Sequence, residues 1–138
     1  MRGALWSLFL LVIVATAPGT SAQETNVAAQ KSAEAWLSMV DRGNYSESWE
    51  EAAKLFRDAV TRSDWEKTAG SVRNPLGQMK SRKLKSATYT ETLPGAPDGE
   101  YVVIQYDTVF ANKKAAIETV VPMKDADGAW RVSGYFIK

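Results

Sequence analysis

Hydrophobic positions in the first half of the chain recur at the spacing of amphipathic helices. The first stripe consists of Ala29, Ala33, Trp36, Leu37 and Val40. We expect this helix to end at Gly43, because glycine tolerates the left-handed conformation of a helix C-cap. The second stripe consists of Tyr45, Trp49, Ala52 or Ala53, and Phe56. These two stripes predict two helices before residue 60.

A third helix is predicted from its capping signals. Ser63 precedes Glu66 by three residues, which is the spacing of a capping box. Its apolar stripe consists of Trp65, Ala69 and Val72. We expect the helix to stop near Asn74, because the residue before a proline is pushed out of the helical region.

From residue 83 onward the pattern changes to the alternation of β-strands. Four strands are predicted, over 83–93, 100–111, 115–124 and 129–137. Turn-forming residues separate them, and the clearest is the hairpin turn over 125–128. Helices followed by a meander of strands predict an α+β fold, with three N-terminal helices packed on a four-stranded antiparallel sheet.

The strand registers can be predicted from the two hairpins. If Phe110 faces Ala115 and Lys124 faces Ala129, both hairpins agree on one apolar side. That side consists of Val102, Ile104, Tyr106, Phe110, Ile117, Val121, Met123, Trp130, Val132 and Phe136. We expect it to pack against the helices, and a slip of one residue would turn these side chains outward.

The first 22 residues have the pattern of a secretory signal peptide. Arg2 precedes a mostly apolar stretch of 14 residues, from Ala4 to Ala17, and small residues then lead to a cleavage site after Ala22. The stretch is shorter than the roughly 20 apolar residues that span a bilayer. We therefore expect a single domain over 23–138, periplasmic or secreted, with no stable membrane anchor after cleavage.

Composition removes several classes of function. The 138 residues include no Cys and no His, which excludes a disulfide framework, a thiolate nucleophile and a His-ligated metal. The formal net charge of +1 argues against nucleic-acid binding, and no cofactor or metal is expected.

Five aromatic residues could line a cleft for a small apolar ligand at the open end of the helix layer. They are Trp36, Tyr45, Trp49, Tyr106 and Trp130. The alternative is that they form ordinary core, as aromatic residues at helical spacing usually do.

One pair of carboxylates could carry acid–base chemistry. The predicted register places Asp107 opposite Glu118, and Glu118 opposite Tyr135, on the outer side of the sheet. If desolvated, one carboxyl would have a raised pKa, or both could share a hard cation. The alternative is that both are solvated, as charges on an exposed strand face commonly are.

The outer side of the predicted sheet is more apolar than a solvated face requires. It presents Tyr101, Val103, Val109, Val120, Tyr135 and Ile137. Such a surface could bind a second copy of the chain or a protein partner, or it could be scattered surface residues. The basic residues Lys80, Arg82, Lys83 and Lys85 could meet an anion, or they could protect a sheet edge from strand pairing.

Several segments resemble one bacterial family of uncharacterised proteins, the domain of unknown function 4019. They are Ala33-Glu-Ala-Trp-Leu, Tyr45-Ser-Glu-Ser-Trp, Pro75-Leu-Gly, Arg82-Lys-Leu-Lys-Ser-Ala-Thr-Tyr, Leu93-Pro-Gly-Ala-Pro-Asp-Gly-Glu-Tyr and Trp130-Arg-Val-Ser-Gly-Tyr-Phe-Ile. The resemblance implies a small exported domain and carries no activity. The order of elements is also similar to the cystatin-like folds of nuclear transport factor 2 and ketosteroid isomerase, whose catalytic residues match no positions here.

These observations predict an exported binding or protein-interaction module rather than an enzyme. The alternative is an isomerase, lyase or hydrolase that uses Asp107 or Glu118 as its base.

Overall fold

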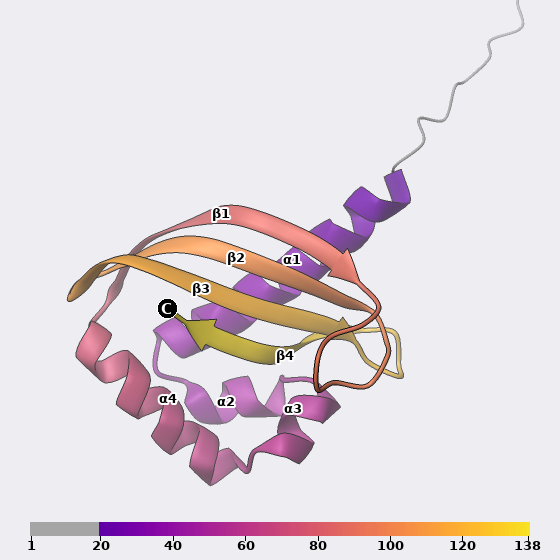
Figure 1. Ribbon diagram of the computed structural model, residues 1–138. Helices are drawn as coiled ribbons and strands as arrows, with labels where there is room; N and C mark the ends of the chain where they lie inside the picture. The colour runs from indigo at the N-terminus through magenta and orange to yellow at the C-terminus, as the bar shows by residue number, and fades with distance from the viewer. Residues whose placement is uncertain (1–19) are drawn as a thin grey trace, which may run out of the picture.

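A computed structural model describes residues 20–138, in which four helices precede four strands (Figure 1). The helices are α1 (Thr20–Asp41), α2 (Tyr45–Glu50), α3 (Lys54–Ala59) and α4 (Arg62–Leu76). The strands are β1 (Met79–Thr90), β2 (Tyr101–Phe110), β3 (Lys113–Lys124) and β4 (Trp130–Ile137). Most of the predicted signal peptide lies outside the described residues, and Ala22 lies near the start of α1. No helix between residues 20 and 76 is long and apolar enough to cross a membrane.

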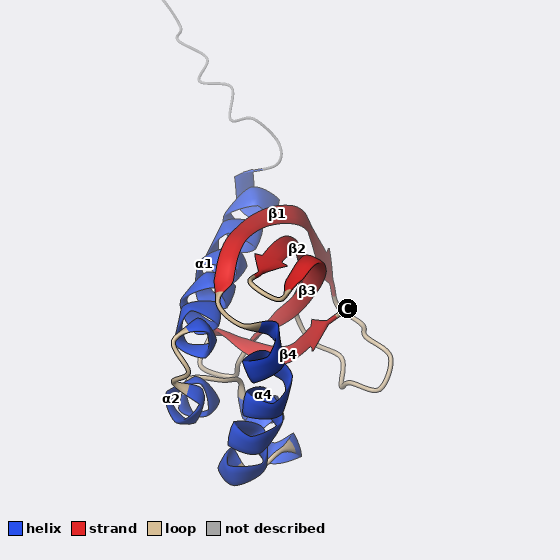
Figure 2. Ribbon diagram, turned by 90° about the vertical axis from the view of Figure 1, so that its left-hand side faces the viewer, coloured by secondary structure: helices blue, strands red, loops and turns tan. Residues whose placement is uncertain are grey.

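The four strands form one antiparallel sheet in the order β1-β2-β3-β4. Figures 1 and 2 show α1 crossing one side of this curved sheet, with the shorter helices lying beyond α1 and β4. The predicted α+β class and the four-stranded meander are therefore confirmed.

The second predicted helix is divided into α2 and α3. Ala53 lies between them in an extended conformation, and its N–H donates a hydrogen bond of 2.8 Å to the carbonyl oxygen of Val132 in β4. An N–H bonded to a strand cannot donate within a helix, so the helix is interrupted here. The end of α1 agrees with the prediction, because Gly43 follows it with a φ of +77°.

Helix α4 begins and ends differently from the prediction. Thr61, and not Ser63, is the N-cap, because its hydroxyl accepts from the backbone N–H of Asp64 at 3.2 Å. The helix also continues through Pro75 to Leu76. Its inner face is Trp65, Ala69 and Arg73, while Val72 is exposed. The third buried position of α4 is therefore Arg73, four residues after Ala69, whereas the sequence pattern predicted Val72 at that position.

The predicted register of β3 is wrong by one residue. Ile104 pairs with Val120 and Thr108 with Ala116, whereas the hairpin predicted Val121 and Ile117 as their partners. The turn is shorter than expected, because Phe110 pairs with Lys113. A register shift between Thr108 and Phe110 then gives β3 one extra residue opposite β2. Such a bulge reverses the orientation of every side chain that follows it.

The two sides of the sheet therefore differ from the predicted ones. The helix-covered side holds Val102, Ile104, Tyr106, Phe110 and Val132, as predicted, together with Glu118, Val120, Tyr135 and Ile137, which were predicted to face outward. We name the opposite side the open face. It consists of Val103, Gln105, Asp107, Val109, Ile117, Thr119, Val121, Gly134 and Phe136. Ile117, Val121, Met123 and Phe136 were wrongly predicted to face the helices.

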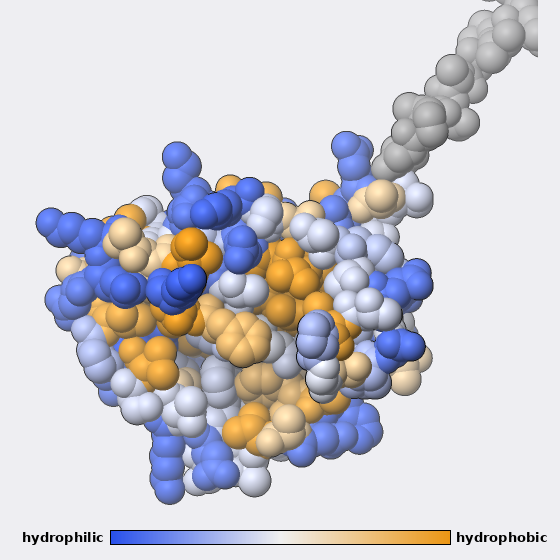
Figure 3. All heavy atoms as spheres, in the orientation of Figure 1, coloured by the Kyte–Doolittle hydropathy of each residue, from blue (hydrophilic) through white to orange (hydrophobic). Residues whose placement is uncertain are grey.

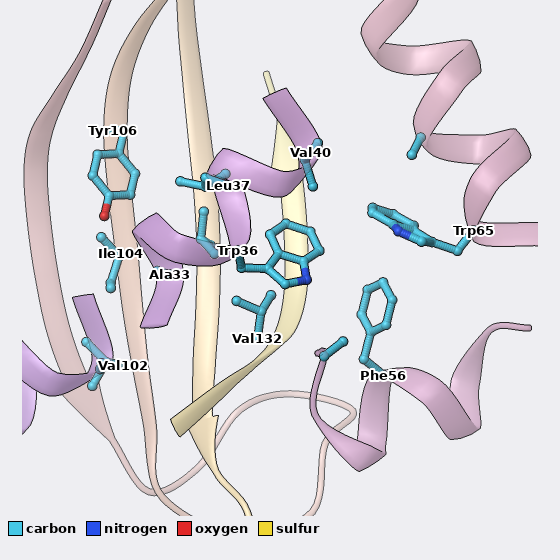
Figure 4. Packing of buried hydrophobic residues seen from close by; sticks show 14 residues of the cluster. Ala33, Trp36, Leu37, Val40, Phe56, Trp65, Val102, Ile104, Tyr106 and Val132 are labelled. Carbon is cyan, nitrogen blue, oxygen red and sulfur yellow. The ribbon is translucent and has the colours of Figure 1, made fainter. Parts of the chain in front are cut away.

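Trp36 is the centre of the core between the sheet and the helices. Its ring lies 5.7 Å from Trp65 and 6.2 Å from Phe56, and 5.3 Å from Tyr135 on the sheet side. Figure 4 shows Trp36 between Val132 on β4 and the pair Phe56 and Trp65. Its indole N–H donates to the carbonyl oxygen of Ser48 at 2.8 Å. All five residues of the predicted first stripe are buried, so α1 packs with the face that the sequence indicated.

Candidate functional site

Asp41, the last residue of α1, accepts hydrogen bonds from two arginines. Arg73 on α4 donates to its Oδ1 at 2.8 Å, and Arg82 on β1 donates to Oδ2 at 2.8 Å and to Oδ1 at 3.0 Å. Asp41 lies at the carbonyl end of its helix, where a negative charge is unfavourable. The two guanidinium groups offset that cost and join α1 to α4 and to β1.

Glu118 on β3 extends this network into the sheet. Its side chain is fully buried and accepts from Arg82 at 2.7 Å and from the hydroxyl of Thr108 at 2.6 Å. The hydroxyl of Tyr135 donates to its other oxygen. A buried carboxylate is tolerated only when it is paired and its lone pairs are satisfied, and both conditions hold here.

The network changes the acidity of its members. Burial raises the pKa of Asp41, but the hydrogen bonds and charges of Arg82 and Arg73 outweigh burial and hold that pKa below its usual value. Burial and the charge of Glu118 both raise the pKa of Tyr135, so its hydroxyl remains protonated and donates. The arrangement therefore favours the ionised form of Asp41 and the protonated hydroxyl of Tyr135.

Arg73 is buried more deeply than its ion pair requires. Its guanidinium carbon lies 4.9 Å from the centre of the Phe110 ring, in a cation–π arrangement. Among the described residues, neither Nε nor Nη1 of Arg73 has a hydrogen-bond acceptor. Arg73, Asp41 and Tyr45 also line an open cavity of about 270 Å³ at the ends of α1 and α4. The contacts with Asp41 and Phe110 explain why Arg73 is buried, and they support a structural role for this residue.

The five aromatic residues predicted to line a cleft do not share one cavity wall. Trp36 and Tyr106 are 2% and 1% exposed and belong to the core. Trp49 is half-buried and lies under the guanidinium of Arg62 at 5.1 Å, while Trp130 packs at the margin of the core. Tyr45 alone of the five lines the cavity beside Asp41. Ligand binding by these residues stays a prediction.

The predicted pairing of Asp107 with Glu118 is wrong. Asp107 pairs with Ile117 and lies exposed on the open face, while Glu118 pairs with Tyr106 and is buried on the helix-covered side. The sheet separates the two carboxylates, because adjacent positions of a strand point to opposite sides. They therefore cannot act together on one substrate or one cation. The predicted pairing of Glu118 with Tyr135 is also wrong, because Glu118 pairs with Ile137 and Tyr135 pairs with Val120. The hydroxyl of Tyr135 nevertheless donates to Glu118 within the buried network.

The open face exposes apolar side chains that no described helix covers. Phe136 is 64% exposed, and its ring lies against Gly134, whose missing side chain leaves room for it. Val103, Val109 and Ile117 are half-buried on the same side. Of the predicted interface residues, only Val103 and Val109 lie uncovered here. Tyr101 points to this side but is covered by the 91–100 loop, where its hydroxyl donates to the carbonyl oxygen of Pro97 at 2.5 Å.

A basic hollow lies at the end of the open face where β2 turns into β3. It measures about 560 Å³ and is lined by Ser81, Lys83, Asp107, Thr108, Val109, Lys113, Lys114, Ala115, Ala116, Ile117 and Lys138. Four lysines and one aspartate give this lining a formal charge of +3. Figure 3 shows hydrophilic side chains projecting around hydrophobic ones at this end of the molecule. Among the predicted basic residues, Lys83 belongs to the hollow and Arg82 to the buried network.

The sequence did not reveal that three further lysines lie in the hollow. Lys113 precedes the bulge in β3, Lys114 lies within it, and Lys138 follows β4, far from Lys83 along the chain. A signal was present, because basic residues recur in β1, in the β2–β3 turn and at the end of β4, and the predicted meander brings these three segments to one end of the sheet.

The fold and its surfaces define a small α+β domain with a buried polar network and an open sheet face. The chain belongs to the family described as Protein of unknown function (DUF4019), which residues 32–135 match. This match covers α1 from Ser32 through most of β4 and confirms the resemblance inferred from the sequence segments. No curated protein and no solved structure matches the chain.

Proposed function

We propose that this domain is an exported, non-enzymatic interaction module that binds its partner through the open face of its sheet. The observation that carries the proposal is the exposure of Phe136, 64% of whose side chain is accessible on that face. Half-buried Val103, Val109 and Ile117 lie on the same side of the sheet. A contiguous exposed apolar surface on a soluble domain is typical of an association site.

Export is the second part of the proposal and rests on the sequence of residues 1–22. The charged start, short apolar stretch and small residues before Gln23 have the pattern of a cleaved signal peptide. Fractionation of a bacterium that expresses the full chain tests it. We expect a periplasmic or secreted product whose first residue is Gln23, and a cytoplasmic product that keeps Met1 would contradict export.

The third part concerns the fold. Helices followed by a curved four-stranded meander, with α1 lying across one side, support assignment to the cystatin-like folds of the nuclear transport factor 2 type. Fold alone does not give function, so this assignment carries no activity to the chain.

Site-specific photocrosslinking tests the use of the open face. A photoreactive amino acid replaces Val103 on the open face in one variant and Glu66 on α4 in a control variant. We expect an adduct in the producing cells only from position 103, and we expect Phe136→Ser to abolish it. Equal crosslinking from both positions, or no effect of Phe136→Ser, would contradict the proposal.

A further inference from the structure

We propose that the partner of the open face is an anionic lipid surface, which the basic hollow contacts. This inference rests on the proposed function and names the partner of the same face. The first observation is charge, because four lysines line the hollow at the β2–β3 end of the sheet: Lys83, Lys113, Lys114 and Lys138. Asp107 is the acidic residue on the open face at this end, and its carboxylate lies 3.9 Å from the ammonium group of Lys85.

The kind of basic residue distinguishes a membrane from a protein partner. Protein interfaces are enriched in arginine and aromatic anchors and depleted in lysine. The hollow contains lysines and no arginine, since Arg82 turns inward to Asp41 and Glu118. Lysine carries a point charge on a flexible apolar stem, which suits a fluid surface of headgroups without fixed geometry.

The hollow also presents apolar residues, as a membrane contact requires. Val109, Ala115 and Ile117 line it together with the lysines, and Phe136 is on the next strand, paired with Thr119 two positions along from Ile117. Surface-binding elements combine basic residues that attract anionic lipids with apolar side chains that enter the headgroup region. The open face presents both classes of residue together.

The β3 bulge is the local device that builds this arrangement. The extra residue lies between Lys113 and Ala116 and lets Lys113, Lys114 and Ala115 all contribute to the hollow. Regular alternation would direct every second one of these side chains to the covered side. Bulges commonly reorient side chains beside functional sites.

Co-sedimentation with lipid vesicles tests the inference. The protein is purified after export and mixed with vesicles of phosphatidylcholine alone or of phosphatidylcholine with phosphatidylglycerol. We expect binding to the phosphatidylglycerol vesicles only, and we expect it to weaken as the salt concentration rises, because salt screens exposed charges.

Charge-reversal variants locate the contact. Lys113→Glu with Lys114→Glu should weaken binding at least 25-fold, since one lysine near an anionic surface contributes about five-fold. The control variant, Lys31→Glu with Lys67→Glu, changes the net charge by the same amount at exposed positions of α1 and α4. Because salt screens charges that lie far from the contact, its affinity for the vesicles should stay within about two-fold of the wild-type affinity. Circular dichroism establishes that both variants fold. Equal loss in the two variants, or binding to phosphatidylcholine alone, would overturn the inference.

Three further outcomes distinguish the failure of this inference from the failure of the proposed function. If no vesicle binds but the protein sediments as a dimer that Phe136→Ser dissociates, the lipid inference fails while the open face remains an interaction site. If millimolar inorganic phosphate displaces the protein from vesicles at constant ionic strength, the hollow is a phosphate site and the lipid surface is rejected. If vesicles do not bind and the photocrosslink from position 103 is also absent, both proposals fail.

Discussion

Asp41 and Arg82 are joined by two hydrogen bonds, of 2.8 and 3.0 Å, which tie the last residue of α1 to β1. Arg82 also reaches Glu118, so one guanidinium bridges a helix and the third strand of the sheet. The contribution of each member of this network to the free energy of unfolding can be measured with single substitutions.

Replacing Glu118 with Gln should destabilise the domain by about 3 kcal/mol. The change leaves Arg82 without one of its two buried counter-charges, and breaking a buried ion pair costs several kcal/mol. Urea unfolding followed by tryptophan fluorescence measures the difference. Asp107→Asn is the matched control, because this side chain is 61% exposed and its removal should change the free energy of unfolding by at most about 0.5 kcal/mol. Equal effects of the two variants would show that Glu118 is not part of a buried network.

The contribution of Asp41 should disappear in acid. Burial raises the pKa of Asp41 in the folded domain, but Arg82 and Arg73 lower it by more, so the folded-state pKa is below its usual value. Folding therefore favours the ionised form of Asp41. The stabilisation is fully present above the unfolded pKa of about 3.9 and is lost as the pH falls through the lower folded pKa. The difference in unfolding free energy between the wild type and Asp41→Asn should therefore be constant from pH 7 to 5 and shrink below pH 4. A difference that stays the same at pH 3 would contradict this assignment.

Truncating a buried phenylalanine, Phe56, should destabilise the domain much more than truncating an exposed one, Phe136. Phe56 is 8% exposed and contacts Trp36 and Trp65, so Phe56→Ala should cost about 3–5 kcal/mol. Phe136 is 64% exposed, so Phe136→Ser should cost less than about 1 kcal/mol. Guanidinium unfolding of both variants makes the comparison. A large loss in Phe136→Ser would place this residue in the core and remove the basis of the open-face proposal.

Two glycines should give opposite results on replacement by alanine. Gly70 lies within α4, where an added Cβ would meet Asn74 and Tyr45 at an ordinary 3.8 Å, so Gly70→Ala should stabilise the domain by about 0.5–1 kcal/mol. Gly43 has a φ of +77°, and alanine there should cost about 1–2 kcal/mol although no atom lies within 4 Å. Thermal unfolding of the two single variants checks both signs.

The elements could be predicted because their periodicity is local. The stripe from Ala29 to Val40 and the alternation of β2 follow from side-chain spacing alone, and the structure buries the residues that the spacing selects. The order of the strands followed as well, since short turns between strands impose antiparallel neighbours.

The sides of β3 could not be predicted, because a bulge has no strong signature in a single sequence. Ala115 and Ala116 fit either side of a sheet, and β3 contains Val120 and Val121 in succession. Hydrophobicity therefore did not distinguish the two registers, and the deciding feature was the shift between Thr108 and Phe110. The carboxylate pair and part of the predicted interface were wrong because of this shift. The predicted register of β4 was wrong as well, since Lys124 pairs with Trp130 and not with Ala129, and a second shift lies between Val121 and Pro122.

The polar core was missed for a different reason. Arg73 and Glu118 stand at buried positions, but a pattern of hydrophobic residues assigns charged residues to the surface. Each is paired inside with groups from distant segments, and that pairing exists only once the chain is folded.

The buried network also sets an order of events for a growing chain. Asp41, Arg73 and Arg82 are synthesised first, whereas Glu118 and Tyr135 arrive only with the last two strands. Until β3 is added, Arg73 and Arg82 have only the carboxylate of Asp41 as their partner within this network. The network is therefore complete only when β4 has joined the sheet, and a chain that ends before β4 would leave Glu118 without the hydroxyl of Tyr135.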